Sequence, residues 1–329
     1  MPRLIPETSP PATPWKARHA DEDYGVSAEP SWREVDWARR LHRVDVDGSS
    51  VNYVDIGEGD SPPVLLVHGL GGQWQNWLEN IPRIARERRV LALDLPGHGR
   101  SEMPREKITI QGYGRAVDGF LERLGVGRAH VVGNSMGGFV SSELAIQFPE
   151  RVERLVLVSA AGISNTSLYR APALTIGRVA TALTAITAAR HRSMAKRPIT
   201  RHAAIALVAR HPSLLKPDLV WEGLMKGAGK PGFDDALRAN LEYDFRERLP
   251  EIQAPTLVVW GEKDSILSVH DAGEFERLIP DARKVVMEDT GHVPMVERPI
   301  AFNDLVMQFL AETGPAEERE PVDHESQRI

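Results

Sequence analysis

The sequence predicts an α/β protein with a mostly parallel β-sheet that carries helices on both faces. Short, unbroken apolar runs recur along the chain, and amphipathic stretches of helical length separate them. Strands that are buried on both faces lack polar alternation, which is typical of parallel sheets. The chain has 329 residues, of which 42% are hydrophobic, and this is enough for a large buried core.

The expected strands start with a hairpin. Two β-rich segments flank Asp47-Gly48, a dipeptide typical of a two-residue hairpin turn. The strands that we expect, in chain order, are Leu41–Asp47, Val51–Ile56, Pro63–Val67, Val90–Asp94, Ala129–Val132, Leu155–Ser159, Thr256–Trp260 and Lys284–Met287. The helices that we expect around them are Asn76–Glu87, Ile110–Leu124, Phe139–Phe148, His270–Leu278 and Pro299–Ala311.

The strand pattern stops between Gly162 and Pro250, where the composition is helical. We therefore expect residues 41–162 and 251–313 to form the α/β core and residues 163–250 to form an inserted helical cap. The cap segment carries 14 basic and 7 acidic residues, a net charge of +7, whereas the whole chain carries −6. Either a solvated helical face happens to be basic, or the segment attracts an anionic substrate or surface.

The two ends of the chain differ in composition from the core. Residues 1–40 form a predicted N-terminal extension, rich in Pro, Ala, Glu and Asp up to about residue 30. Residues 314–329 form a predicted disordered tail. Trp15, Trp32 and Trp37 are unusual in such an extension, so we expect them either to pin it to the protein body or to make incidental contacts.

Composition excludes several classes of function. The chain has no cysteine, which excludes a thiol nucleophile, a disulfide framework and a Cys-based metal site. Its net charge of −6 gives no indication of nucleic-acid binding. The first residues lack an apolar segment and a small-residue cleavage site, which argues against a secretory signal and favours a cytoplasmic protein. Arg178 and several threonines in the weakly charged stretch 171–189 argue against stable membrane insertion.

A Gly-x-Ser-x-Gly turn, Gly133–Gly137, places Ser135 between a predicted strand and a predicted helix. The flanking glycines allow two backbones to approach closely, and the sharp turn aims the serine outward as a nucleophile. The motif alone is equally typical of an ordinary glycine-rich turn. The strand–turn–helix context and the partners downstream favour a nucleophile.

A serine nucleophile needs a base and an orienting carboxylate, and parallel sheets place such groups where strands end. Asp264 follows one apolar strand and is the expected acid, because its nearest rival, Glu262, falls on the other side of the turn. His292 follows the last predicted strand and is the expected base. The chain order Ser135, Asp264, His292 is typical of one hydrolase fold.

Two backbone N–H groups are expected to bind the oxyanion. Met136 supplies the first from the start of its helix, and Leu70, in the segment His68-Gly69-Leu70-Gly71-Gly72, supplies the second. A flexible glycine-rich turn is the alternative for that segment. We expect the loop Asp94–Ser101 to be structural, with His98 as a hydrogen-bonded buttress and Asp94 held by Arg100 or by backbone N–H groups.

In order and spacing, five of these segments resemble the α/β-hydrolase fold superfamily. They are His68-Gly69, Asp94–Ser101, Gly133–Gly138, Gly261–Asp264 and Gly291-His292. The resemblance covers about residues 41–162 and 251–312. It implies an eight-stranded, mostly parallel sheet with a helical cap between strands six and eight. It also implies the roles given above to Ser135, Asp264, His292, Leu70 and Met136.

Departures from related families narrow the function. Serine at position 135 disfavours haloalkane dehalogenases and epoxide hydrolases, which carry an Asp nucleophile. The Gly133–Gly138 elbow is similar to that of the meta-cleavage-product hydrolases, which break C–C bonds in dienoic acids. Those enzymes usually show Trp directly after the catalytic His, whereas Val293 follows His292 here. Cofactor-free perhydrolases stay open, without a feature that favours them.

The sequence therefore predicts a serine esterase, of carboxylesterase or monoacylglycerol-lipase type, that needs no metal and no organic cofactor. Its expected substrate is a small, moderately apolar ester, because the cap is rich in Leu, Ala and Val. Two alternatives stay open. One is C–C bond hydrolysis with Arg190 or Arg192 binding a carboxylate, and the other is ligand binding without catalysis. Homodimer formation is also open.

Overall fold

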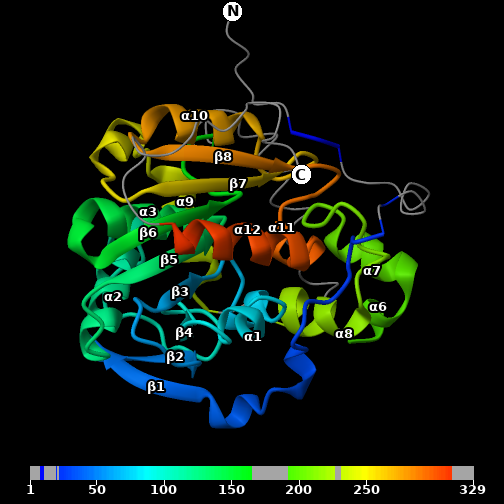
Figure 1. The fold of residues 1–329 in the computed structure, drawn as a ribbon, viewed down its shortest axis with the longest axis horizontal. Coiled ribbons are helices and arrows are strands. Elements are labelled where there is room, and N and C mark those ends of the chain that lie inside the picture. Colours follow the sequence, from blue (N-terminus) through cyan, green and yellow to red (C-terminus); the bar gives the residue numbers. More distant parts are fainter. Residues whose placement is uncertain (1–7, 11–19, 21, 165–191, 227–230, 313–329) are drawn as a thin grey trace, which may run out of the picture.

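The computed structural model describes residues 8–10, 20, 22–164, 192–226 and 231–312 (Figure 1). Several sequence-based expectations lie outside these residues. They are the contacts of Trp15, the character of residues 171–189, the position of Arg190 and the predicted disordered tail at 314–329.

Eight strands form one sheet in the order β1-β2-β4-β3-β5-β6-β7-β8. Strand β2 runs antiparallel to both of its neighbours, and the pairs from β4 to β8 are parallel. The strands are β1 (Leu41–Val46), β2 (Ser49–Ile56), β3 (Val64–Val67), β4 (Val90–Leu93), β5 (Ala129–Asn134), β6 (Val152–Val158), β7 (Thr256–Gly261) and β8 (Ala282–Met287). The predicted fold class, including its eight strands, is confirmed.

The hairpin between β1 and β2 turns at Asp47-Gly48, as predicted. Asp47 has φ 50° and Gly48 has φ 77°, so both residues are left-handed. Two-residue hairpin turns that match the twist of the strands require this conformation, which asparagine, aspartate and glycine tolerate best.

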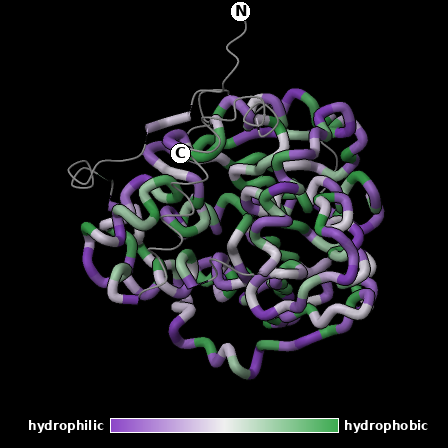
Figure 2. The backbone as a smooth tube through the Cα atoms, turned by 180° about the vertical axis from the view of Figure 1, so that it is seen from behind, coloured by the Kyte–Doolittle hydropathy of each residue, from purple (hydrophilic) through white to green (hydrophobic). Residues whose placement is uncertain are grey.

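Helices cover both faces of the sheet. Alternate strand residues point to opposite faces, so each strand contributes to two apolar clusters. One cluster lies beneath α2 (Ile110–Arg123), α3 (Met136–Gln147) and α10 (His270–Leu278). The other lies beneath α1 (Ile81–Ile84), α11 (Pro294–Glu297) and α12 (Pro299–Ala311). Figure 2 shows hydrophobic segments gathered in the interior and hydrophilic segments around the outline.

The predicted single helix over Asn76–Glu87 is wrong. The segment instead forms a short 3₁₀ helix, η4 (Trp74–Trp77), and the four-residue α1. Pro82 explains the break, because proline has no N–H to donate and its ring clashes with the preceding turn of a helix. In contrast, α3 begins earlier than the predicted Phe139, directly after Ser135.

The β6–β7 connection, residues 159–255, is called the insertion below. Its described elements are helical: α6 (Arg192–Lys196), α7 (Pro198–Ile205), α8 (Pro217–Leu219), η6 (Val220–Met225), α9 (Phe233–Glu242) and η7 (Arg246–Glu251). They pack into both apolar clusters, so the insertion contacts the core rather than standing apart from it (Figure 1). Within the described ranges, no helix combines the length and apolar character that a bilayer crossing requires.

The described part of the N-terminal extension is fastened to the core. Trp32 is buried and donates its indole N–H to Glu79 Oε1 at 3.0 Å. The Trp37 ring packs against Trp74 with 4.9 Å between ring centroids. Tyr24 is buried as well, although it lies in the stretch predicted to be loosely ordered. Short 3₁₀ turns, η2 (Trp32–Glu34) and η3 (Trp37–Arg39), lead from this segment into β1.

Candidate active site

Ser135 lies in a strained turn between β5 and α3. Its backbone has φ 54° and ψ −121°, a conformation that residues with a side chain rarely adopt. Close backbone contacts maintain the turn, because a Cβ atom on Gly133 would lie 2.3 Å from the Gly137 carbonyl oxygen. A Cβ atom on Gly137 would lie 2.2 Å from the Val67 carbonyl oxygen. Glycine is therefore required on both sides of the serine.

Asp264 and His292 meet at the same edge of the sheet, after β7 and β8. His292 Nδ1 lies 2.8 Å from Asp264 Oδ2, and both side chains are almost completely buried. The other carboxylate oxygen of Asp264 accepts the N–H groups of Ile266 and Leu267 at 2.8 and 3.0 Å. These bonds hold the carboxylate in the turn. The Asp264–His292 bond favours the imidazole tautomer with its proton on Nδ1, which leaves Nε2 available as a base.

The turn around Ser135, Gly133–Gly137, is called the serine turn below, and residues 288–293 between β8 and α11 are called the histidine loop. Asn134 bonds the serine turn to the histidine loop. The Asn134 side-chain amide donates to the His292 carbonyl oxygen at 3.2 Å and to the Val158 carbonyl oxygen at 3.1 Å. Among the contacts of the described residues, no hydrogen bond joins the Ser135 hydroxyl to the His292 imidazole. The structure thus brings the loops of Ser135 and His292 together and pairs His292 with Asp264.

The loop after β3 lies against the serine. A Cβ atom on Gly69 would lie 3.1 Å from Ser135 Cβ. Within the part of the chain that the structure describes, neither the Leu70 N–H nor the Met136 N–H donates to a protein acceptor. Met136 begins α3, whose N-terminus carries a partial positive charge. Both N–H groups belong to segments that adjoin Ser135.

His68 fixes the orientation of the peptide that contains the Leu70 N–H. His68 Nε2 accepts the Leu95 N–H at 3.0 Å, so the ring proton sits on Nδ1. Nδ1 donates to the Gly69 carbonyl oxygen at 2.7 Å. Because that carbonyl and the Leu70 N–H belong to one planar peptide unit, holding the first sets the direction of the second. Burial lowers the pKa of His68 to about 4, so the ring is neutral at pH 7.

The loop after β4 supports this arrangement from beneath. The Asp94 carboxylate accepts the N–H groups of Trp74 and Arg100 and the Asn52 side-chain amide, each at 2.8 Å. Backbone N–H groups therefore hold Asp94, as one of the two predicted arrangements requires. His98 is buried with its ring centroid 5.2 Å from that of His68. Burial lowers the pKa of His98 to about 3, which fits a structural role better than a catalytic one.

Within the described part of the chain, no contact found for the other residues considered from the sequence involves the Asp264 or His292 side chain. Glu262, the rival acid, accepts the Asp289 N–H and pairs with Lys263. Arg192 is exposed at the start of α6. Among the described residues, no three His, Asp or Glu side chains are placed to share a metal ion.

The supporting roles of three residues of this site were not predicted from the sequence. Asn134, His68 and Glu297 hold the serine turn, the Leu70 loop and the histidine loop, respectively. Asn134 directly precedes Ser135, and His68 belongs to the glycine-rich segment that contains Leu70, so their positions offered a signal. Glu297 offered none, because two of its bonding partners, Tyr24 and Arg210, are distant in the sequence.

Comparison with known proteins identifies the family to which this fold belongs. Residues 62–299 match the model of the alpha/beta hydrolase fold family, and the chain belongs to that family. The chain is similar to the dihydrolipoyllysine-residue acetyltransferase component of the acetoin cleaving system of Pseudomonas putida. That match is 32% identical and covers 82% of this chain and 68% of the relative.

A second relative is 2-hydroxy-6-oxo-6-phenylhexa-2,4-dienoate hydrolase of Comamonas testosteroni, which is 30% identical. The match covers 82% of this chain and 94% of that enzyme. Among solved structures, a membrane phospholipase A described as a bacterial virulence factor is similar, with a TM-score of 0.66 and 30% identity. That match covers 82% of this chain and 85% of the other. The proteins that this chain resembles thus include a dienoate hydrolase and a phospholipase A.

Proposed function

We propose that this protein is a serine hydrolase that cleaves carboxylic esters through an acyl-enzyme. The observation that carries the proposal is the 2.8 Å Asp264–His292 bond at the sheet edge that also holds the strained Ser135 turn. A buried carboxylate bonded to Nδ1 orients an imidazole for work at Nε2. The similarity to a phospholipase A at 30% identity supports ester chemistry.

In the proposed reaction, His292 Nε2 takes the Ser135 hydroxyl proton as the serine oxygen attacks the ester carbonyl. The carbonyl oxygen gains negative charge and receives the N–H groups of Leu70 and Met136, each worth about 3 kcal/mol to the transition state. The imidazolium gives its proton to the departing alkoxide, which leaves as the alcohol. The acyl group is then bound to Ser135.

Water completes the cycle. His292 takes a proton from a water molecule, whose oxygen attacks the acyl carbon, and returns the proton to the Ser135 oxygen as the acid departs. Asp264 keeps the imidazole tautomer and stabilises its positive charge during both steps. We propose that the insertion lines the substrate pocket, and its many Leu, Ala and Val residues favour a small, moderately apolar ester.

The test is hydrolysis of p-nitrophenyl esters with acyl chains of graded length. Wild-type protein is expected to release p-nitrophenol, with a preference for one range of chain lengths. Ser135→Ala is expected to lose activity by about 10³-fold or more while it keeps its fold. Equal turnover by this variant would overturn the nucleophile assignment.

C–C bond hydrolysis is the second candidate, favoured by the 30% identity to a dienoate hydrolase. Incubation with a yellow 2-hydroxy-6-oxo-dienoate distinguishes the two reactions, because loss of colour requires cleavage of the conjugated chain. Rapid bleaching with no ester turnover would replace the ester proposal. Slow turnover of both substrates, combined with strong thermal stabilisation by a ligand, would favour a binding protein instead.

A further inference from the structure

Glu297, at the end of α11, is a completely buried carboxylate. It lies five positions after His292, and it is bonded to the backbone on both sides of that residue. The Gly291 N–H lies 3.0 Å from each carboxylate oxygen, and the Val293 N–H lies 3.2 Å from Oε1. One carboxylate therefore binds the amides that directly precede and follow the residue bearing the imidazole.

The backbone of His292 itself is fixed by two other segments. Its N–H donates to the Val208 carbonyl oxygen of the insertion at 2.9 Å. Its carbonyl oxygen accepts the Asn134 side-chain amide. The loop is not part of a helix or a strand at this point, so these external bonds take the place of regular secondary structure.

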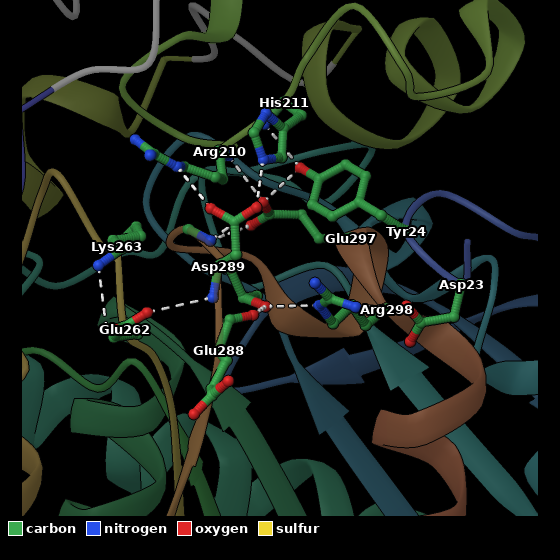
Figure 3. A network of polar contacts seen from close by, with 12 residues as sticks. Asp23, Tyr24, Arg210, His211, Glu262, Lys263, Glu288, Asp289, Glu297 and Arg298 are labelled. Carbon is green, nitrogen blue, oxygen red and sulfur yellow. Dashed lines mark hydrogen bonds and ion pairs between the residues drawn. The ribbon is translucent and has the colours of Figure 1, made fainter. Parts of the chain in front are cut away.

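Glu297 also binds the insertion and the N-terminal extension. Its Oε2 accepts the Arg210 N–H at 2.7 Å and the Tyr24 hydroxyl at 2.5 Å. The Tyr24 oxygen in turn accepts the His211 N–H at 2.8 Å. Figure 3 shows Glu297 between Tyr24 and the Arg210–His211 segment. The same carboxylate thus joins the histidine loop to two segments that are distant in sequence.

A second carboxylate reinforces this junction. Asp289 has a left-handed backbone, φ 44°, in the turn that leads from β8 to His292. Its side chain pairs with Arg210 at 2.9 Å and with His211 at 2.6 Å (Figure 3). Residues 210 and 211 of the insertion are therefore held by carboxylates on both sides of His292 in the sequence, Asp289 and Glu297.

Burial makes the negative charge of Glu297 energetically unfavourable. Burial raises the pKa of its carboxyl group, while the donated bonds from Tyr24, Arg210, Gly291 and Val293 oppose that rise. A buried carboxylate is maintained only where enough donors surround it. Here, three of the four donors belong to the histidine loop or to the insertion segment beside it.

We propose that Glu297 is a positioning residue for His292. Through its bonds to Arg210 and Tyr24, Glu297 also couples the position of the insertion on the core to the placement of the imidazole. The proposal deepens the proposed function and rests on His292 being the base. Glu297 acts by fixing the peptide units on either side of residue 292, so the ring meets Ser135 in one orientation. A displacement of a reacting group by about 1 Å is enough to slow a reaction by about 10²-fold.

The matched control is Glu79, another carboxylate that is almost completely buried. It accepts the Ala28 N–H, the Ser27 hydroxyl and the Trp32 indole N–H, so it also fastens the N-terminal extension. None of these donors belongs to the histidine loop. A merely structural role for Glu297 predicts that Glu297→Gln and Glu79→Gln behave alike.

The experiment compares these two variants with wild type in ester hydrolysis and in proton NMR of the His292 Nδ1–H signal, which His292→Asn assigns. In Glu297→Gln one carboxylate oxygen is replaced by an NH₂ group that faces donors. We expect kcat to fall by about 10- to 100-fold with KM changed less than about twofold, and the Nδ1–H signal to shift or broaden. Glu79→Gln is expected to change neither kcat nor the signal, although both variants lower the melting temperature.

If Glu297→Gln does not fold, Tyr24→Phe provides the test. This variant keeps the Glu297 carboxylate and removes the Tyr24 hydroxyl that donates to it. We expect its kcat to fall by about threefold with a smaller shift of the same signal. The proposal is overturned if the variant that folds shows wild-type kcat and an unshifted signal, or if Glu79→Gln shows the same kinetic loss. Failure of Ser135→Ala or His292→Asn to abolish turnover would instead refute the proposed function.

Discussion

Asn134 donates its side-chain amide to the main-chain carbonyl oxygen of His292 at 3.2 Å. The residue before the proposed nucleophile is thus bonded directly to the residue that carries the proposed base. The same amide reaches Val158 at the end of β6, so one side chain joins the ends of three neighbouring parts of the site. We therefore expect the relative placement of Ser135 and His292 to depend on this amide.

Asn134→Asp is expected to be more damaging than Asn134→Ala. Aspartate has no donor when ionised and would place its charge against the carbonyl oxygens of His292 and Val158. Alanine only leaves these oxygens unpaired, at a cost of about 1–3 kcal/mol for each buried group. Urea unfolding and kcat measurements check this order. Equal activity of wild type and Asn134→Asp would show that the amide bond has no role in placing the two loops.

Ser135→Gly is expected to stabilise the fold while it abolishes turnover. Glycine adopts φ 54° without the steric cost that serine bears, and the strain at such a position is of the order of 1–3 kcal/mol. The extra entropy of glycine in the unfolded chain offsets about 0.5–1 kcal/mol of that gain. We expect the melting temperature to rise, because the relieved backbone strain exceeds the cost of the extra entropy of glycine in the unfolded chain. A lower melting temperature than that of Ser135→Ala would contradict the strain.

Gly137→Ala and Gly127→Ala form a matched pair. The added methyl group on residue 137 would lie 2.2 Å from a backbone oxygen that cannot move away, whereas the one on residue 127 meets nothing within 4 Å. We expect Gly137→Ala to cost about 3 kcal/mol or more and to remove activity. We expect Gly127→Ala to leave activity intact and to change stability by less than about 1 kcal/mol. Denaturant titration compares the two, and similar losses in both variants would contradict the packing described for the serine turn.

His68 makes stability depend on pH in the acid range. Burial lowers its folded pKa to about 4, so the unfolded chain binds more protons than the folded protein between about pH 6.5 and 4. The contribution of neutral His68 to the free energy of unfolding is therefore fully present above pH 6.5, and it is lost as the pH falls through the folded pKa of about 4. For this group it amounts to about 3 kcal/mol.

The measurement is the free energy of unfolding of wild type and of His68→Asn between pH 7 and pH 4. Buried His130, whose pKa is lowered to about 3 without a contribution from His68, titrates in both proteins, so its effect cancels in the difference. We expect the difference between the two proteins to shrink as the pH falls. A difference that is constant over this range would show that His68 does not titrate with folding.

The strands could be predicted because both faces of most of them are buried, which leaves continuous apolar runs such as Val64–Val67 in the sequence. The hairpin turn at Asp47-Gly48 could be predicted because both residue types tolerate the left-handed backbone that the turn requires. The helix predicted over Asn76–Glu87 was wrong because Pro82 outweighs the apolar periodicity there. The turn and this error both depend on interactions between near neighbours in the chain.

The supporting residues of the site depend on distant contacts. Asn134 is 158 residues from His292, and Tyr24 is 273 residues from Glu297. Nothing in the local pattern around Glu297 distinguishes it from a solvated glutamate at a helix end. The strand ends that carry Ser135, Asp264 and His292 could be predicted, because parallel strands place these ends at one edge. The bonds that hold them required the structure.

Covalent capture tests the central claim most directly. Wild-type protein is treated with a p-nitrophenyl alkylphosphonate, which phosphonylates an activated serine and releases p-nitrophenol, and the modified peptide is identified by mass spectrometry. We predict one phosphonyl group per chain, located on Ser135, with rates reduced strongly in His292→Asn and no adduct in Ser135→Ala. Ester turnover by a protein whose Ser135 stays unmodified, or an adduct on another residue, would contradict the account.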